Sequence, residues 1–165
     1  MDAPDFPGSP AENWPDGPLV LGVTWQPSAR LVRVAAGLAA GLGLHLVCAF
    51  VDPASYLTER DPVGSRTAVS LDPAPNDEAQ FPSGQVLRGL EAVLGPPGAR
   101  WSFRVLNGDV SRALGRLAES TGASLLIVGG PRAGVLARMD RLLEGSVSAS
   151  LIRTQPRPVL VVPGL

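Results

Sequence analysis

The sequence predicts an α/β fold, a single domain built on a five-stranded parallel sheet with helices on both faces. Short runs that are apolar nearly throughout recur along the chain, as in strands buried on both sides. Segments with apolar residues three and four positions apart lie between them, as in helices with one buried face. This alternation is typical of parallel strands joined by right-handed crossovers, and 165 residues suit one domain.

The first predicted elements follow one another closely. Residues 19–23, LVLGV, form a short strand that ends at Thr24. Ser28 can cap the next helix, and Gly43 ends it. The apolar residues expected on one face of this helix are Leu31, Val32, Ala35, Leu38, Ala39 and Leu42. Residues 44–51 are again apolar nearly throughout, which predicts a second strand inside the sheet.

Two residues of this second strand invite chemical interpretations, and both are expected to be structural. Cys48 is the lone cysteine and lies in an apolar run, which favours a buried thiol over a disulfide or a zinc ligand. His45 is the lone histidine, at the start of an interior strand, so we expect a packed or hydrogen-bonded ring rather than a catalytic base. Serine hydrolase chemistry is disfavoured because no G-x-S-x-G motif occurs and no histidine follows Ser146, Ser148 and Ser150.

The pattern disappears over residues 52–82. Repeated Asp-Pro and Ala-Pro steps disfavour helix and strand there, which predicts a long proline-rich excursion. A helical stripe follows and ends at GPPG, and its apolar residues are Val86, Leu87, Leu90, Val93 and Leu94. Trp101, Phe103 and Val105 then alternate with polar residues, as in a strand with one solvent-exposed face at the edge of a sheet.

The remaining elements complete the sheet. Asp109 or Ser111 begins a helix that ends at Gly122, and its apolar residues are Val110, Leu114, Leu117 and Ala118. Residues 125–128 form a fourth apolar strand, followed by a glycine-bearing loop, a helix near 146–153 and a last strand over 158–162. Ligands of such open sheets bind beyond the carboxyl ends of the strands where the strand order reverses, which points to residues 24–28 and to Gly129 onward.

Composition and the amino terminus restrict the function. The formal net charge of −1 gives no broad basic field for nucleic acid or an anionic membrane. No segment reaches the ~18 apolar residues of a membrane-spanning helix. Residues 1–17 are acidic and proline-rich and lack the basic start and apolar stretch of a signal peptide, which predicts a disordered tail on a cytoplasmic protein. The folded domain is then expected over residues 18–165.

Three segments together resemble the universal stress protein family. They are LVLGV followed by Ser28 near the beginning, NGDVSRALGRLAESTGASLLIVGG, and GSVSASLIRTQPRPVLVVP near the end. The resemblance covers most of residues 18–163. It implies an adenine nucleotide alpha hydrolase-like sheet in the strand order 3-2-1-4-5. It also implies a non-catalytic stress-response module that dimerises and can bind ATP or a related nucleotide.

The resemblance extends to a glycine loop with two departures. Nucleotide-binding members carry G-x-x-G, nine residues, then G-[ST], in which backbone N–H groups and a helix start approach phosphate oxygens. Gly129, Gly145 and Ser146 match the ends of this motif. Arg132 stands in place of the second glycine, and fifteen residues rather than twelve separate Gly129 from Gly145, as in a divergent branch of the family. Thr24 stands where nucleotide-binding members usually carry an aspartate.

The resemblance therefore implies a set of ligand-binding residues at the ends of the first and fourth strands. Those expected at the phosphates are Gly129, Gly130, Arg132, Gly134, Gly145, Ser146 and Val147. Thr24, Trp25 and Val51 are expected on the nucleoside side, where threonine offers one hydrogen bond and the indole can stack on a base.

Alternatives of other classes remain open. The first is a nucleotide-independent protein-interaction module, in which the altered loop serves a protein partner. A nucleotide hydrolase lacks an evident general base or metal cluster. A phosphoacceptor receiver domain would need acidic residues where Thr24 and Asn107 stand, and no P-loop motif occurs.

The last strand predicts a homodimer. In the implied strand order, residues 159–162 form an edge that is apolar on both faces, and such an edge invites pairing with another chain. Family members often dimerise in this way. Pro156 and Pro158 limit where the pairing can begin.

Overall fold

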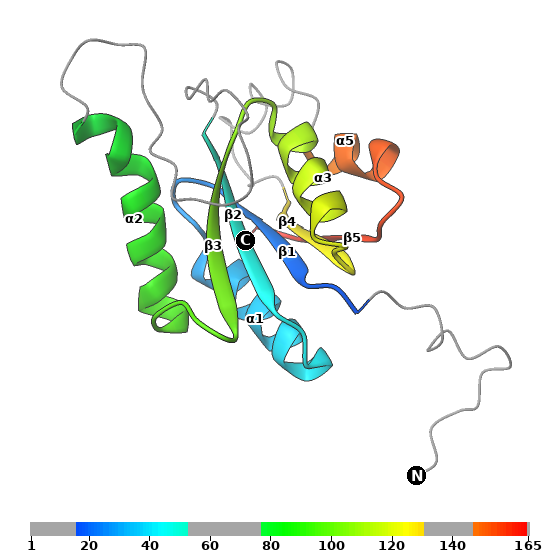
Figure 1. Cartoon of the computed structure of the whole chain (residues 1–165), viewed down its shortest axis with the longest axis horizontal. Coiled ribbons are helices and arrows are strands. Elements are labelled where there is room, and N and C mark those ends of the chain that lie inside the picture. Colours follow the sequence, from blue (N-terminus) through cyan, green and yellow to red (C-terminus); the bar gives the residue numbers. More distant parts are fainter. Residues whose placement is uncertain (1–15, 53–76, 131–146, 165) are drawn as a thin grey trace, which may run out of the picture.

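Five parallel strands form one sheet in the order β3-β2-β1-β4-β5, as seen in Figure 1. The computed structural model describes residues 16–52, 77–130 and 147–164. Its strands are β1 (Leu19–Val23), β2 (Leu46–Asp52), β3 (Trp101–Asn107), β4 (Leu125–Gly129) and β5 (Val159–Val162). Its helices are α1 (Ala29–Leu42), α2 (Asp77–Leu94), α3 (Val110–Ser120) and α5 (Val147–Thr154). The predicted fold class and strand order are confirmed.

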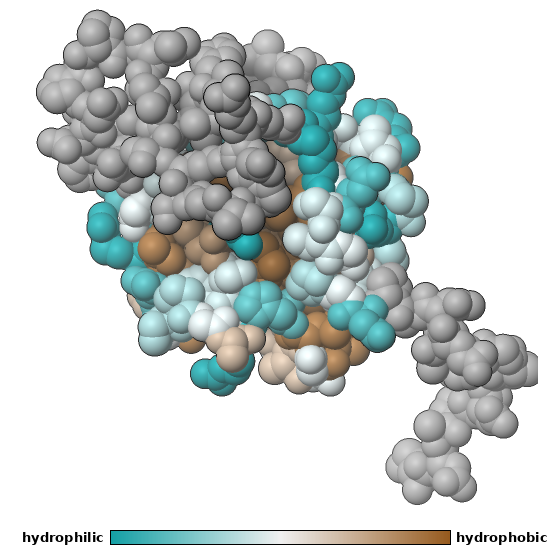
Figure 2. All heavy atoms as spheres, in the orientation of Figure 1, coloured by the Kyte–Doolittle hydropathy of each residue, from teal (hydrophilic) through white to brown (hydrophobic). Residues whose placement is uncertain are grey.

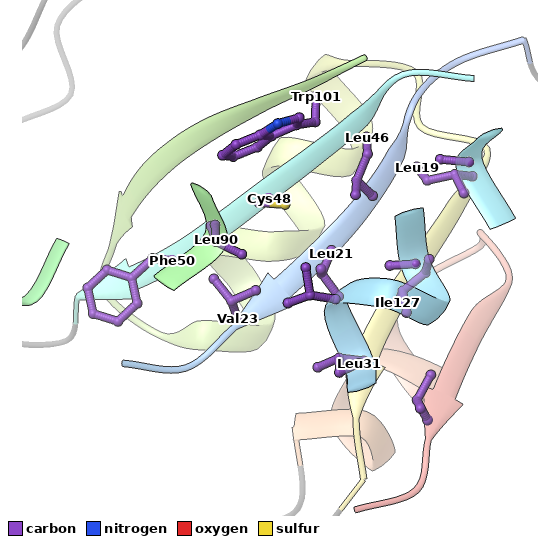
Figure 3. Packing of buried hydrophobic residues seen from close by; sticks show 14 of the residues in the cluster. Leu19, Leu21, Val23, Leu31, Leu46, Cys48, Phe50, Leu90, Trp101 and Ile127 are labelled. Carbon is purple, nitrogen blue, oxygen red and sulfur yellow. The ribbon is translucent and has the colours of Figure 1, made fainter. Parts of the chain in front are cut away.

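The apolar strands are buried on both faces because each face packs against its own helices. Helices α1 and α2 cover one face, and that core includes Leu21, Cys48, Phe50, Leu90 and Trp101 (Figure 3). Helices α3 and α5 cover the other, where the core includes Val20, Val47, Ala49, Leu114 and Leu151. Successive residues of β1 and β2 alternate between the two cores, so neither strand needs a polar side.

Helix α1 has the ends that its sequence predicts. The side chain of Ser28 accepts a hydrogen bond from the Leu31 N–H at 3.5 Å, and Gly43 ends the helix in the left-handed conformation with φ 67°. The prediction was wrong for Leu42, which is 49% exposed. Leu42 is the last residue of the helix, next to the Gly43 cap, and it is not part of the core that Leu31 and Ala39 join.

The predicted proline-rich excursion is too long at both ends. Strand β2 continues through Asp52, which pairs in register with Asn107 of β3. Helix α2 begins at Asp77 and runs through Pro82. Proline removes one helical hydrogen bond, but Val86 and Leu90 farther along the helix are fully buried, and such packing supplies most helix stability in proteins. The rest of the excursion and most of the predicted tail lie outside the described residues.

Strand β3 is an edge strand, as predicted, and its apolar side chains are buried to different extents. Trp101 at its start is buried, whereas Val105 is 40% exposed, although the sequence places both on one apolar face. Helix α2 ends shortly before Trp101, so its last turns lie near the beginning of β3. Figure 2 shows hydrophobic residues at the surface between α2 and α3, the helices that cover opposite faces of the sheet.

The structure resolves the start of α3 and confirms the role of His45. Asp109 is the N-cap, and its Oδ1 accepts from the Arg112 N–H at 2.9 Å, while Ser111 lies inside the helix and is buried. The His45 ring lies between β2 and β3, with Nδ1 2.9 Å from the carbonyl of Ala99 and Nε2 2.9 Å from Ser102 Oγ. The lone histidine is therefore hydrogen-bonded in a structural position.

Cys48 is buried in β2, as predicted, and it makes stability depend on pH above neutrality. Burial raises the pKa of its thiol from 9.0 to about 12. Above pH 9 the unfolded chain loses a proton that the folded chain retains, so stability falls as pH rises towards 12. We expect the unfolding free energy of the wild type to fall, relative to Cys48→Ala, by about 1.4 kcal/mol per pH unit in this interval.

Urea unfolding of both proteins at several pH values between 8 and 11 measures this difference. The chain suits the experiment because it has no lysine and one tyrosine, so few other groups titrate there. Unfolding free energies that stay parallel across the interval would contradict the burial of a protonated thiol.

Candidate functional site

The carboxyl ends of the five strands meet at one edge of the sheet, and this edge is the candidate site. The chain leaves β1 into α1 on one face, whereas α5, the described helix that follows β4, packs on the opposite face. Strand order therefore reverses between β1 and β4, which is where ligands of open α/β sheets bind. The edge predicted from the sequence is the one that the topology produces.

The β1 end presents a large exposed aromatic side chain. Trp25 is 59% exposed at this edge, the largest hydrophobic side chain so exposed among the described residues. The hydroxyl of Thr24 donates to the carbonyl of Gln26 at 3.2 Å, so it closes the turn that carries the indole. A Cβ added to Gly89 of α2 would lie 3.6 Å from Pro27 Cγ, so Pro27 lies against this part of α2. The predicted nucleoside side thus offers mainly a surface for stacking.

The two glycines at the end of β4 have different surroundings. The Gly130 N–H donates to the carbonyl of Val162 at 2.7 Å, and a Cβ there would lie 3.3 Å from Pro163 Cα. Gly130 therefore joins β4 to β5, and its N–H is already used. A Cβ on exposed Gly129 would reach only ordinary contact with Leu31, at 3.4 Å from its Cδ2. Gly129 is the glycine of this pair that remains open to a ligand.

The side chains of two predicted site residues point into the core. Val51 is buried against α3 and α5, and Val147 at the beginning of α5 packs against the same cluster. The Val51 side chain faces the core because residues alternate along β2, and contact of this residue with a ligand stays a prediction. Arg132, Gly134, Gly145 and Ser146 lie outside the described residues, and their roles stay predictions.

Sequence reasoning did not identify a polar pair beside the site. Asp52 ends β2 and pairs in register with Asn107, which ends β3. The Oδ1 atom of Asn107 is inaccessible to solvent and has no hydrogen-bond partner. The sequence feature that could have identified the pair is a polar residue at the end of each strand, at the edge where ligands bind.

Metal binding and Schiff-base chemistry each need particular side chains. Among the described residues, no three histidine, cysteine, aspartate or glutamate residues lie close enough to hold a metal ion. The sequence contains no lysine, so all 14 basic residues are arginine and Schiff-base chemistry has no amine side chain. No helix in the described ranges is long and apolar enough to cross a membrane.

Solved structures share this arrangement. A universal stress protein from Archaeoglobus fulgidus is 20% identical with a TM-score of 0.59, over 88% of this chain and 92% of its own. A universal stress protein family member from Burkholderia pseudomallei is 25% identical with a TM-score of 0.58, over 96% of this chain and all of its own. A universal stress protein in complex with cAMP is 21% identical with a TM-score of 0.56, over 90% and 99% of the two chains.

The sequence comparison agrees with the structural one. No curated protein matches the chain. The sequence pattern of the universal stress protein family matches residues 19–163, which is nearly the whole length. The chain therefore belongs to the universal stress protein family.

Proposed function

We propose that this protein is a non-catalytic stress-response module that binds ATP or a related adenine nucleotide at the β1 and β4 ends. The observation that carries the proposal is the juxtaposition of exposed Trp25 with Gly129 at the reversal of strand order. The indole offers a face for the base, and the glycine lets a phosphate approach the backbone. A cytoplasmic location is the setting that the sequence predicts.

The family comparison supports the class of ligand. One similar structure is a universal stress protein in complex with cAMP. The universal stress protein of Archaeoglobus fulgidus has also been solved in complex with dAMP, at 19% identity and a TM-score of 0.54 to this chain. Both ligands carry an adenine base and a phosphate, the two groups that the candidate site can contact.

The direct test identifies small molecules released from the purified protein and then titrates ATP into the emptied protein by calorimetry. We expect a co-purified adenine nucleotide or a measurable heat of binding. No bound nucleotide and no heat up to millimolar ATP would overturn the proposal and favour the nucleotide-independent interaction module.

Two substitutions locate the site without disturbing the core. Trp25→Ala is expected to weaken ATP binding by about tenfold or more, because stacking of a base on an aromatic ring contributes ~1–3 kcal/mol. Gly129→Ala is expected to weaken it as well, with little change in melting temperature, because its Cβ meets only Leu31 at ordinary distance. Equal affinities of both variants and wild type would place the ligand elsewhere.

We also propose a homodimer through β5. The two edges of the sheet differ, since β3 carries exposed Arg104 and β5, Val159–Val162, carries no charged residue. Charged side chains protect an edge from pairing with another chain, so β3 is the protected edge. Exposed Ile152 lies on α5, the helix that leads into β5, and offers an apolar group on this side of the molecule.

A further inference from the structure

We propose that the carboxylate of Asp52 binds the ribose of the nucleotide by accepting hydrogen bonds from its two hydroxyls. The inference rests on the proposed function and deepens it, because it assigns a residue that selects ribonucleotides over deoxyribonucleotides and over nucleotides that carry a 2′-phosphate. It is carried by the register of β1 and β2 and by the chemistry of the strand ends.

Asp52 lies beside the β1 end that carries Trp25. Val23, the last residue of β1, pairs in register with Phe50, and neighbouring strands lie ~4.8 Å apart. Asp52 continues β2 two residues beyond this pair, and Trp25 follows Val23 by the same two residues. Phe50 faces the core under α1, so by alternation Asp52 lies on the side of the sheet toward which the chain leaves β1. The carboxylate and the exposed indole therefore occupy neighbouring positions at this edge.

The strand ends divide the site by charge. Of the five residues that end the described strands, Asp52 alone is ionisable. A carboxylate accepts hydrogen bonds but donates none, and it repels a phosphate. Gly129 ends β4, two strands away across β1, at roughly 10 Å. This arrangement orients the nucleotide, with its phosphates at Gly129 and its nucleoside at Trp25 and Asp52.

The ribose suits the carboxylate better than the adenine base does. Its adjacent hydroxyls offer two donors to the two carboxylate oxygens, whereas the amine of adenine stands beside a ring-nitrogen acceptor that would face a carboxylate unfavourably. In dinucleotide-binding α/β sheets an acidic residue likewise accepts from a ribose hydroxyl near a glycine-bound phosphate. Asp52 is half-buried, so it stays partly open to a ligand.

The test compares ATP with 2′-deoxy-ATP by calorimetric titration of wild type and Asp52→Asn. Wild type is expected to bind ATP about tenfold more tightly, because hydrogen bonds to charged groups are stronger than those between neutral groups. Asparagine keeps the size of the side chain but loses its charge and one acceptor oxygen. The ratio of the two affinities should therefore fall towards one in Asp52→Asn.

A 2′-phosphate gives a second readout of the same contact. Wild type is expected to bind AMP at least about tenfold more tightly than AMP with a second phosphate on its 2′ oxygen, because the carboxylate repels that phosphate. Asp52→Asn should remove most of this difference, since an amide can donate to a phosphate oxygen. A purely structural Asp52 would change both affinities together and leave their ratio as in wild type.

Asp109→Asn is the matched control. It removes the same charge from an exposed side chain, and asparagine caps helices as well as aspartate does, so α3 should keep its start. Asp109 follows β3, which β2 separates from β1. This variant is expected to keep both wild-type ratios. Equal changes in the two variants would assign the effect to net charge and overturn the role of Asp52.

The remaining outcomes separate this inference from the proposed function. Wild type that binds ATP and 2′-deoxy-ATP equally, or Asp52→Asn that keeps the wild-type ratios, would overturn the role of Asp52 and leave the nucleotide site standing. Failure of wild type to bind any of these nucleotides would overturn both.

Discussion

Gly17→Ala is expected to destabilise the protein by roughly 3 kcal/mol, at the upper end of the effect of inserting atoms into a packed region. A Cβ at Gly17 would overlap the backbone carbonyl of Gly122. Neither side can move freely. The Ser124 hydroxyl donates to the Gly17 carbonyl at 2.6 Å, and the Ser124 N–H donates to the Pro18 carbonyl at 3.0 Å, which joins the beginnings of β1 and β4.

Gly37→Ala in α1 is the matched control. A Cβ at this exposed helical glycine meets nothing within 4 Å, so alanine should raise stability by ~0.5–1 kcal/mol through its helix propensity. Urea unfolding of both variants and wild type measures the two effects with opposite signs. If Gly17→Ala unfolded at the wild-type urea concentration, the close approach of the two backbones would not be as tight as described.

Most of the fold follows from the sequence because its signals are local. The apolar runs of β1 and β2, the cap at Ser28 and the stop at Gly43 each act within a few residues of the chain, and the structure places them as predicted, except that β2 begins at Leu46 rather than at residue 44. The errors arise where contacts with a segment distant in the sequence determine the local structure. Pro82 lies inside α2 because Val86 and Leu90 of the same helix pack on the sheet. The residues next to Pro82 do not reveal this packing.

The candidate site was predictable in location but not in detail. Parallel strands and a reversal of strand order place it at the β1 and β4 ends, and family motifs add Gly129. The direction of a side chain depends on register, so the sequence did not show that the Val51 side chain faces the core. The pair of Asp52 and Asn107 was not identified from the sequence for the same reason. The register that pairs them and the buried Oδ1 atom of Asn107 are properties of the folded structure.

Ile152→Glu is expected to raise the dissociation constant of the proposed homodimer by at least about tenfold. The side chain is 59% exposed on α5, so the substitution should leave the folded protomer intact. In a two-fold interface every residue occurs twice, so one substitution removes two apolar groups and introduces two like charges. Sedimentation velocity over a micromolar concentration series measures the shift from dimer to monomer.

Val34→Glu provides the comparison that assigns this effect to the β5 side of the molecule. Val34 is 40% exposed, and it lies on α1, which covers the opposite face of the sheet from α5. Both variants add one negative charge in place of an exposed apolar side chain, so a general effect of charge would change them equally. We expect only Ile152→Glu to dissociate the dimer. Equal dissociation, or a wild type that is monomeric at micromolar concentration, would contradict pairing through β5, and loss of the dimer in Val34→Glu alone would place the interface on α1.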